Sequence, residues 1–108
     1  MIETIAAQPM RQHPRVEANF VVRLISSTRS VLARAADLSL AGLALVDPAG
    51  ELRKHNFDRV ALSIPGEEGE VILPVKVARR HGDTVAFTFA QLDWDDLFTL
   101  ARYLSPRL

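Results

Sequence analysis

The 108-residue sequence contains no cysteine and few aromatic residues, with one tryptophan, one tyrosine and five phenylalanines. The absence of cysteine excludes disulfides, cysteine-ligated zinc and thiol catalysis, and it suits a cytoplasmic protein. No segment approaches the ~18–20 consecutive apolar residues of a membrane span, so we expect no direct membrane insertion. Residues 1–10 also lack the basic start and the sustained apolar stretch of a secretory signal.

Catalytic and metal-binding patterns are lacking as well. His13, His55 and His81 are scattered without the spacing of metal ligands. The sequence has no GxSxG nucleophile elbow, no GxxxxGK[ST] phosphate loop and no GxGxxG dinucleotide motif. We therefore expect a binding protein, not an enzyme, with no metal and no cofactor.

The formal net charge is zero, but the charges are unevenly distributed. Residues 11–34 hold five arginines and one glutamate, a local excess of four positive charges. Residues 47–70 hold six acidic and three basic residues, a local excess of three negative charges. A nucleic acid polymer would favour a broad basic surface, so this small basic region fits a compact dianion better.

Short runs of strand-forming residues dominate the middle of the chain, with turn signals between them. The runs cover residues 20–25, 31–36, 43–46, 59–64, 71–78 and 84–89. Asp47–Gly50 is a strong turn signal, and His81-Gly82-Asp83 predicts a tight hairpin. Pro74 predicts an edge position or a bulge in its strand. The pattern predicts an all-β domain, either an antiparallel barrel or a sandwich.

The two ends of the chain differ from this middle part. Residues 1–18 form an extended N-terminal arm in which Pro9 and Pro14 exclude a helix, and residues 19–108 form the domain. Near the C-terminus, apolar residues recur at the spacing of an amphipathic helix: Trp94, Leu97, Phe98, Ala101 and Leu104. We expect Trp94 and Phe98 to pack in the core, against an open end of the barrel.

Two short motifs carry the recognisable chemistry. Arg11 and Arg15 form an RxxxR spacing in the arm, and Asp37, Ser39 and Gly42 form DxSxxG between two predicted strands. Guanidinium groups bind phosphate oxygens bidentately and stack on aromatic faces. A carboxylate on a turn can accept two parallel hydrogen bonds from the edge of a guanine base. Together these residues predict a receptor for an anionic guanine nucleotide.

The two motifs in this order resemble the PilZ domain family, bacterial receptors of cyclic di-GMP, over about residues 10–105. The resemblance implies a six-stranded antiparallel (split) β-barrel with a C-terminal α-helix. It also implies that Arg11 and Arg15 contact phosphates and guanine faces, that Asp37 reads a guanine edge and that Ser39 bonds phosphate or guanine. Gly42 would leave room for the ligand and permit a backbone angle closed to other residues.

Each of these residues also has a structural interpretation. The arginines could be solvated charges, Asp37 and Ser39 could cap a turn, and Gly42 could sit in a bulge. Arg79 and Arg80 are interpreted as a solvated strand end that could extend the basic rim. Two other functions remain open: a PilZ-like interaction module of pilus or flagellar machinery that binds no nucleotide, and a small barrel for single-stranded nucleic acid. The second needs exposed aromatic residues, whereas Phe20, Phe87 and Phe89 look like core.

The resemblance thus predicts a cyclic di-GMP receptor of bacterial second-messenger signalling. Closure of the arm over the ligand would pass the signal to an effector protein or a covalently attached domain that controls motility, pili or exopolysaccharide synthesis. The chain could stand alone or be the regulatory domain of a larger protein such as a cellulose synthase. Met10, where relatives that take a nucleotide dimer carry a basic residue, favours one nucleotide per domain.

Overall fold

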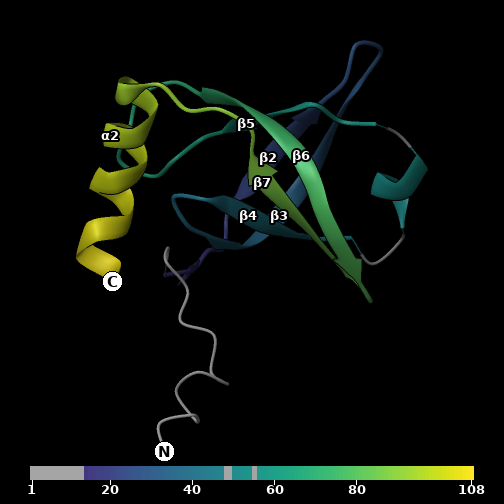
Figure 1. The fold of residues 1–108 in the computed structure, drawn as a ribbon, viewed down its shortest axis with the longest axis horizontal. Coiled ribbons are helices and arrows are strands. Elements are labelled where there is room, and N and C mark those ends of the chain that lie inside the picture. Colours follow the sequence, from purple (N-terminus) through teal and green to yellow (C-terminus); the bar gives the residue numbers. More distant parts are fainter. Residues whose placement is uncertain (1–13, 48–49, 55) are drawn as a thin grey trace, which may run out of the picture.

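The computed structural model describes residues 14–47, 50–54 and 56–108, which are largely β-structure (Figure 1). The strands are β1 (Val16–Glu17), β2 (Val21–Ile25), β3 (Ser30–Leu38), β4 (Gly42–Val46), β5 (Arg59–Leu62), β6 (Val71–His81) and β7 (Thr84–Phe89). The helical elements are the 3₁₀ helix η1 (Glu51–Lys54), the α-helix α2 (Trp94–Leu104) and the 3₁₀ helix η2 (Ser105–Arg107).

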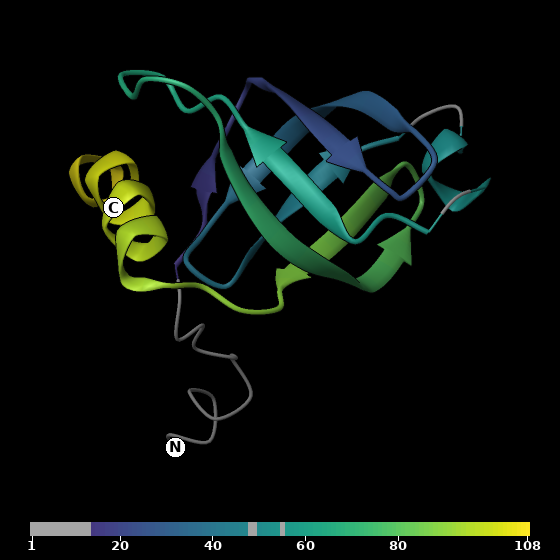
Figure 2. The same ribbon diagram turned by 90° about the horizontal axis from the view of Figure 1, so that it is seen from above.

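Strands β2 to β7 close into an antiparallel barrel (Figure 2). Going around it, β2 pairs with β5, β5 with β6, β6 with β7, β7 with β4, β4 with β3, and β3 again with β2. The short strand β1, which lies within the predicted arm, pairs with the end of β3. The predicted six-stranded antiparallel barrel with a C-terminal helix is confirmed, and β1 is an addition to it.

The inner side chains of the barrel strands form one core, which includes the fully buried Leu24, Leu45 and Leu73. Burying a side chain of this size contributes roughly 1.5–3 kcal/mol, so this core is the main source of stability. Pro74 lies where β6 changes partner, since residues 71–74 pair with β5 and residues 75–81 with β7. The expectation of an edge or bulge position was wrong, and the change of partner explains how a residue without an N–H fits here.

Helix α2 packs against one end of the barrel, and η1 lies at the opposite end (Figures 1 and 2). Asp93 caps the start of this helix, and its Oδ1 accepts a hydrogen bond from the Asp96 amide at 2.9 Å. Leu100, Tyr103 and Leu104 are buried, and the Tyr103 ring meets Phe20 edge to face at 5.9 Å between centroids. No described helix is long and apolar enough to cross a membrane.

The expected burial of Trp94 and Phe98 was wrong, because these side chains are 74% and 58% exposed. Helix α2 carries apolar residues on two faces, and the face that contains Leu100 and Leu104 packs on the barrel instead. Leu104, from the predicted stripe, is buried as expected.

Replacement of Trp94 by alanine is therefore expected to change the free energy of unfolding by only about 0.5 kcal/mol, as is usual at the surface. Thermal or urea unfolding of the Trp94→Ala variant measures this. A loss of about 3–5 kcal/mol, typical of a truncated core aromatic residue, would contradict the exposed position.

Candidate functional site

A β-bulge in β3 determines which way Asp37 points. The register with β4 shifts between Ala35 and Asp37, so that Ala36 is an extra residue. Ala35 and Leu38, on either side, are buried. Because side chains alternate along a regular strand, Asp37 would share the inner face of Ala35 without the bulge. The bulge therefore places the carboxylate on the outer face of the barrel.

A second bulge in β6 does the same for Arg79. The register with β7 shifts between Val77, which pairs with the buried Phe87, and Arg79, which pairs with Ala86. Without the extra residue Ala78, Arg79 would lie on the face of Val77. Two bulges on separate strands thus turn an acid and a base onto the same outer wall.

Asp37 and Arg79 lie in one cross-strand row, separated by two alanines. Asp37 pairs with Ala44, Ala44 with Ala86, and Ala86 with Arg79, across β3, β4, β7 and β6. At a strand spacing of about 4.8 Å, three steps separate the end Cα atoms by roughly 14 Å. Between the two charges the wall carries only two methyl groups, which leaves space above it.

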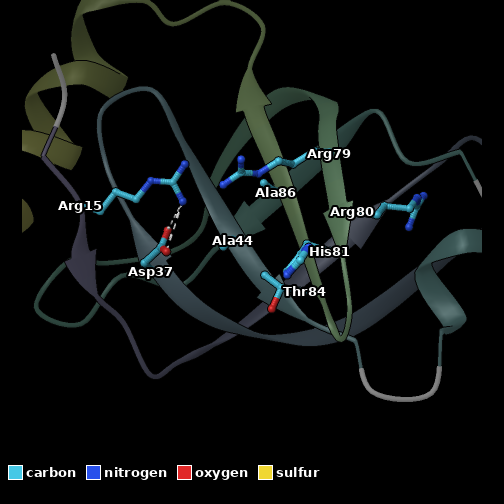
Figure 3. A pocket seen from close by; sticks show the side chains of 8 residues that line it. All are labelled: Arg15, Asp37, Ala44, Arg79, Arg80, His81, Thr84 and Ala86. Atoms are coloured by element: carbon cyan, nitrogen blue, oxygen red, sulfur yellow. Dashed lines mark hydrogen bonds and ion pairs between the residues drawn. The ribbon is translucent and has the colours of Figure 1, made fainter. Parts of the chain in front are cut away.

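Arg15 joins the row from the segment that precedes β1. The pairing of Glu17 with Asp37 brings this segment alongside β3. Arg15 Nη1 donates to Asp37 Oδ1 at 3.2 Å and to Oδ2 at 3.3 Å (Figure 3). The side chains are 32% and 26% exposed, and a surface pair of this kind contributes about 0.2–1 kcal/mol. An anionic ligand could displace it at small cost.

These residues surround a pocket of about 440 Å³, within the size range of small-molecule sites (Figure 3). Its lining consists of Arg15, Asp37, Ala44, Arg79, Arg80, His81, Thr84 and Ala86. Three arginines and one aspartate leave an excess of two positive charges in the lining. The arrangement can bind a compact anion with a flat apolar part over the alanines.

The neighbouring arginines of β6 point in different directions. In Figure 3, Arg79 extends toward Arg15, whereas Arg80 extends away from it. Arg80 Nη2 donates to the carbonyl oxygen of Leu52 in η1 at 3.4 Å. The guanidinium group of Arg79 has no hydrogen bond or ion pair with any residue in the described parts of the chain. Arg79 is therefore the free cation of the pocket.

Ser39 holds the turn between β3 and β4. Its Oγ accepts hydrogen bonds from the amides of Ala41 at 3.0 Å and Gly42 at 3.2 Å, and the side chain is buried. Such local bonds are typical of serine in turns. Ser39 does not line the pocket, and its contact with a ligand stays a prediction.

Gly42 is required by the close approach of β4 to β7. A Cβ atom at this position would lie 2.0 Å from the carbonyl oxygen of Phe87. The φ angle of Gly42 is not positive, so the expectation of a backbone angle closed to other residues was wrong. Gly42 does not line the pocket. Any effect of Gly42 on a ligand would therefore be indirect, through the turn between β3 and β4 that its lack of a side chain makes possible.

Of the predicted site residues, the structure brings Arg15 and Asp37 into contact, while Ser39 and Gly42 shape the corner beside them. Arg11 lies outside the described residues. The sequence interpretation treated Arg79 as a solvated strand end and did not consider Ala44 and Ala86. The described residues contain no group of histidines and acids that could hold a metal ion.

Comparison with known proteins identifies the family. The sequence model described as "PilZ domain" matches residues 9–105. Because this match covers most of the chain, the chain belongs to the PilZ domain family, as the motifs indicated. No curated protein matches the sequence significantly.

Solved structures support the fold. The Bacillus subtilis inhibitor of motility MotI/DgrA superposes with a TM-score of 0.76 at 19% identity, covering 92% of this chain and 51% of that one. The chain thus spans about half the length of MotI. The PilZ domain of CeSA from a cellulose-synthesizing bacterium gives a TM-score of 0.65 at 18% identity, covering 88% and 99% of the two chains. The PilZ domain of Escherichia coli YcgR, solved with c-di-GMP, gives a TM-score of 0.67 at 16% identity, with 92% of each chain covered.

Proposed function

We propose that this PilZ domain is a receptor for cyclic di-GMP and that the pocket over Ala44 and Ala86 is its binding site. The observation that carries the proposal is the contact of Arg15, from the first motif, with Asp37, from the second, at the edge of a positively charged pocket. Two motifs that lie far apart in the sequence meet at one place. YcgR, whose PilZ domain shares this fold, was solved with c-di-GMP, which agrees with this assignment.

The chemistry of the pocket matches this ligand. Cyclic di-GMP carries one negative charge on each of two phosphodiesters, and the lining has an excess of two positive charges. The alanine methyl groups offer a flat surface for a purine ring. When a phosphate takes over Arg15, the Asp37 carboxylate becomes free to accept the two N–H donors of a guanine edge. The Arg15–Asp37 pair would thus open into two separate ligand contacts.

The signal would be transmitted by the arm. Arg11 and Arg15 would close over one nucleotide per domain, and an effector protein or an attached domain would read the new arm position, for example in the cytoplasmic control of motility, pili or cellulose synthesis. Amide hydrogen exchange across residues 8–16, with and without cyclic di-GMP, tests the closure. Added protection in the complex is expected, and equal protection in both states would contradict it.

The receptor function is tested by isothermal titration of the protein with cyclic di-GMP, with GTP and a single-stranded oligonucleotide as controls. Saturable binding of cyclic di-GMP alone is expected. Binding of none of the three would favour the nucleotide-free interaction module, and binding of the oligonucleotide would favour a nucleic-acid-binding barrel.

Arg79 and Arg80 provide a matched pair of variants. Arg79→Ala removes the free cation, and the loss of one charge-assisted hydrogen bond to a phosphate, about 1.5–3 kcal/mol, corresponds to at least about tenfold weaker binding. Arg80→Ala removes the same charge from the neighbouring position, where the guanidinium is turned toward Leu52. It should weaken binding less. Equal losses in both variants would mean that only the net charge of the pocket matters.

A further inference from the structure

The exposed rings of Trp94 and Phe98 form a patch on helix α2 that the barrel does not use. Their centroids lie 6.3 Å apart, with the ring planes tilted by 34°, so the rings make one continuous apolar surface. This Trp94–Phe98 patch contains the only tryptophan of the chain. Isolated exposed apolar residues are ordinary, but two adjacent aromatic rings on one helix face are typical of an interaction site.

The fold itself does not explain this patch. Helix α2 is anchored through Leu100, Tyr103 and Leu104 on its other face. Arg107 covers the Tyr103 ring, with its guanidinium carbon 3.9 Å from the ring centroid. The helix is therefore anchored to the barrel through a face other than the one that carries the two exposed rings.

The surroundings of the patch are acidic. Asp93, Asp95 and Asp96 lie next to Trp94 in the sequence, and no residue in the described parts of the chain forms an ion pair with them. Burial and the nearby Asp93 and Asp95 carboxylates raise the pKa of Asp96, which agrees with a concentration of negative charge.

The one arginine of the helix does not offset this charge. Arg102 is held by Glu67, with Nη2 to Oε1 at 2.9 Å and Nε to Oε2 at 3.1 Å. An acidic aromatic surface of this kind is complementary to apolar side chains flanked by lysine or arginine, since a cation also binds well over the face of a tryptophan ring.

We propose that the Trp94–Phe98 patch is a docking surface for a basic amphipathic segment of a partner protein. The apolar side chains of that segment would cover the two rings, and its lysine or arginine side chains would pair with the free carboxylates, of which Asp95 is the nearest to the rings by helical spacing. A second copy of this chain is disfavoured at this surface, because a symmetric contact would bring like carboxylates together. The proposal does not depend on nucleotide binding.

The single tryptophan makes the proposal directly measurable by fluorescence of the 108-residue chain. The probe is a synthetic peptide of about 18 residues, roughly five helical turns, with leucine at i, i+3, i+4 and i+7 and lysine elsewhere. The matched control peptide carries glutamate in place of lysine. We expect the lysine peptide to shift the Trp94 emission to shorter wavelength and to bind at least about tenfold more tightly than the glutamate peptide.

Four variants, two substitutions at the patch and two controls away from it, locate the site. Asp95→Lys should weaken binding of the lysine peptide by roughly fivefold or more, whereas Asp83→Lys, the same charge change in the β6–β7 hairpin at the other end of the barrel, should leave it nearly unchanged. Phe98→Ala should also weaken binding, and Leu32→Ser, at an exposed apolar position on β3, should not.

Several outcomes would overturn the proposal. Equal affinity for the two peptides, an unchanged Trp94 emission, or equal effects of Asp95→Lys and Asp83→Lys would each exclude a basic partner at this patch. Acrylamide quenching of the protein alone shows whether Trp94 is accessible. If Trp94 is shielded from acrylamide and the shielding grows with protein concentration, a second copy of the chain covers the patch. If the shielding of Trp94 does not depend on concentration, another part of the same chain covers it.

Discussion

Replacement of Arg15 or Asp37 by alanine is expected to weaken cyclic di-GMP binding by at least tenfold. Each residue would supply a charge-assisted hydrogen bond to the ligand, worth about 1.5–3 kcal/mol, and about 1.4 kcal/mol is a factor of ten in affinity. The folded domain should tolerate both changes, because the exposed Arg15–Asp37 pair contributes only about 0.2–1 kcal/mol to stability. Isothermal titration and thermal unfolding of the same samples measure the two effects.

Asp37→Asn separates two possible roles of this carboxylate. The amide keeps the size of the side chain but replaces one acceptor oxygen by a donor, so it cannot accept both N–H groups of a guanine edge. Binding as weak as in Asp37→Ala is expected. If Asp37→Asn binds like the wild type while Arg15→Ala does not, Asp37 only positions Arg15. Unchanged affinity in both alanine variants would exclude this pocket as the site.

Gly42→Ala is expected to destabilise the domain by about 3 kcal/mol or more, near the upper end of overpacking effects. The new methyl group would lie 2.0 Å from the Phe87 carbonyl oxygen, and both atoms belong to paired strands of the barrel wall. This steric clash could be relieved only if β4 and β7 moved apart. Urea unfolding measures the change in the free energy of unfolding.

Gly66→Ala is the control for this variant. Gly66 has a φ of 90°, but no atom lies within 4 Å of a Cβ placed there. Gly66→Ala should therefore lower the free energy of unfolding only by the penalty for a left-handed backbone conformation, about 1–2 kcal/mol. A Gly42→Ala protein as stable as Gly66→Ala would contradict the close approach of the two strands. Loss of ligand binding in Gly42→Ala would not by itself place Gly42 at the ligand.

The barrel could be predicted from the sequence because its strands are bounded by clear turn signals. The β6–β7 hairpin at Gly82 and Asp83 lies where the pattern indicated. Helix α2 was also predicted, but not its orientation. It has apolar residues on two faces, and periodicity alone does not tell which face meets the barrel.

The pocket could be predicted only in part. The RxxxR and DxSxxG motifs identified Arg15 and Asp37. The position of Arg79 on the other side of the pocket depends on a β-bulge, which the alternation of apolar and polar residues in the sequence does not reveal. A regular β6 strand would turn Arg79 to the inner face, and a regular β3 strand would do the same to Asp37. In both strands the extra residue is an alanine directly before the charged residue, Ala36 before Asp37 and Ala78 before Arg79. This common feature can be recognised only once the strand pairing is known.

The most direct measurement of ligand position is nuclear magnetic resonance of the protein with isotope-labelled alanine methyl groups, titrated with cyclic di-GMP. Ala44 and Ala86 lie on the pocket floor, whereas Ala61 lies on β5, in the opposite wall of the barrel. A guanine ring stacked on the floor should shift the methyl signals of Ala44 and Ala86 strongly and leave Ala61 unchanged. Binding that leaves Ala44 and Ala86 unshifted, or no binding, would contradict a cyclic di-GMP site in this pocket.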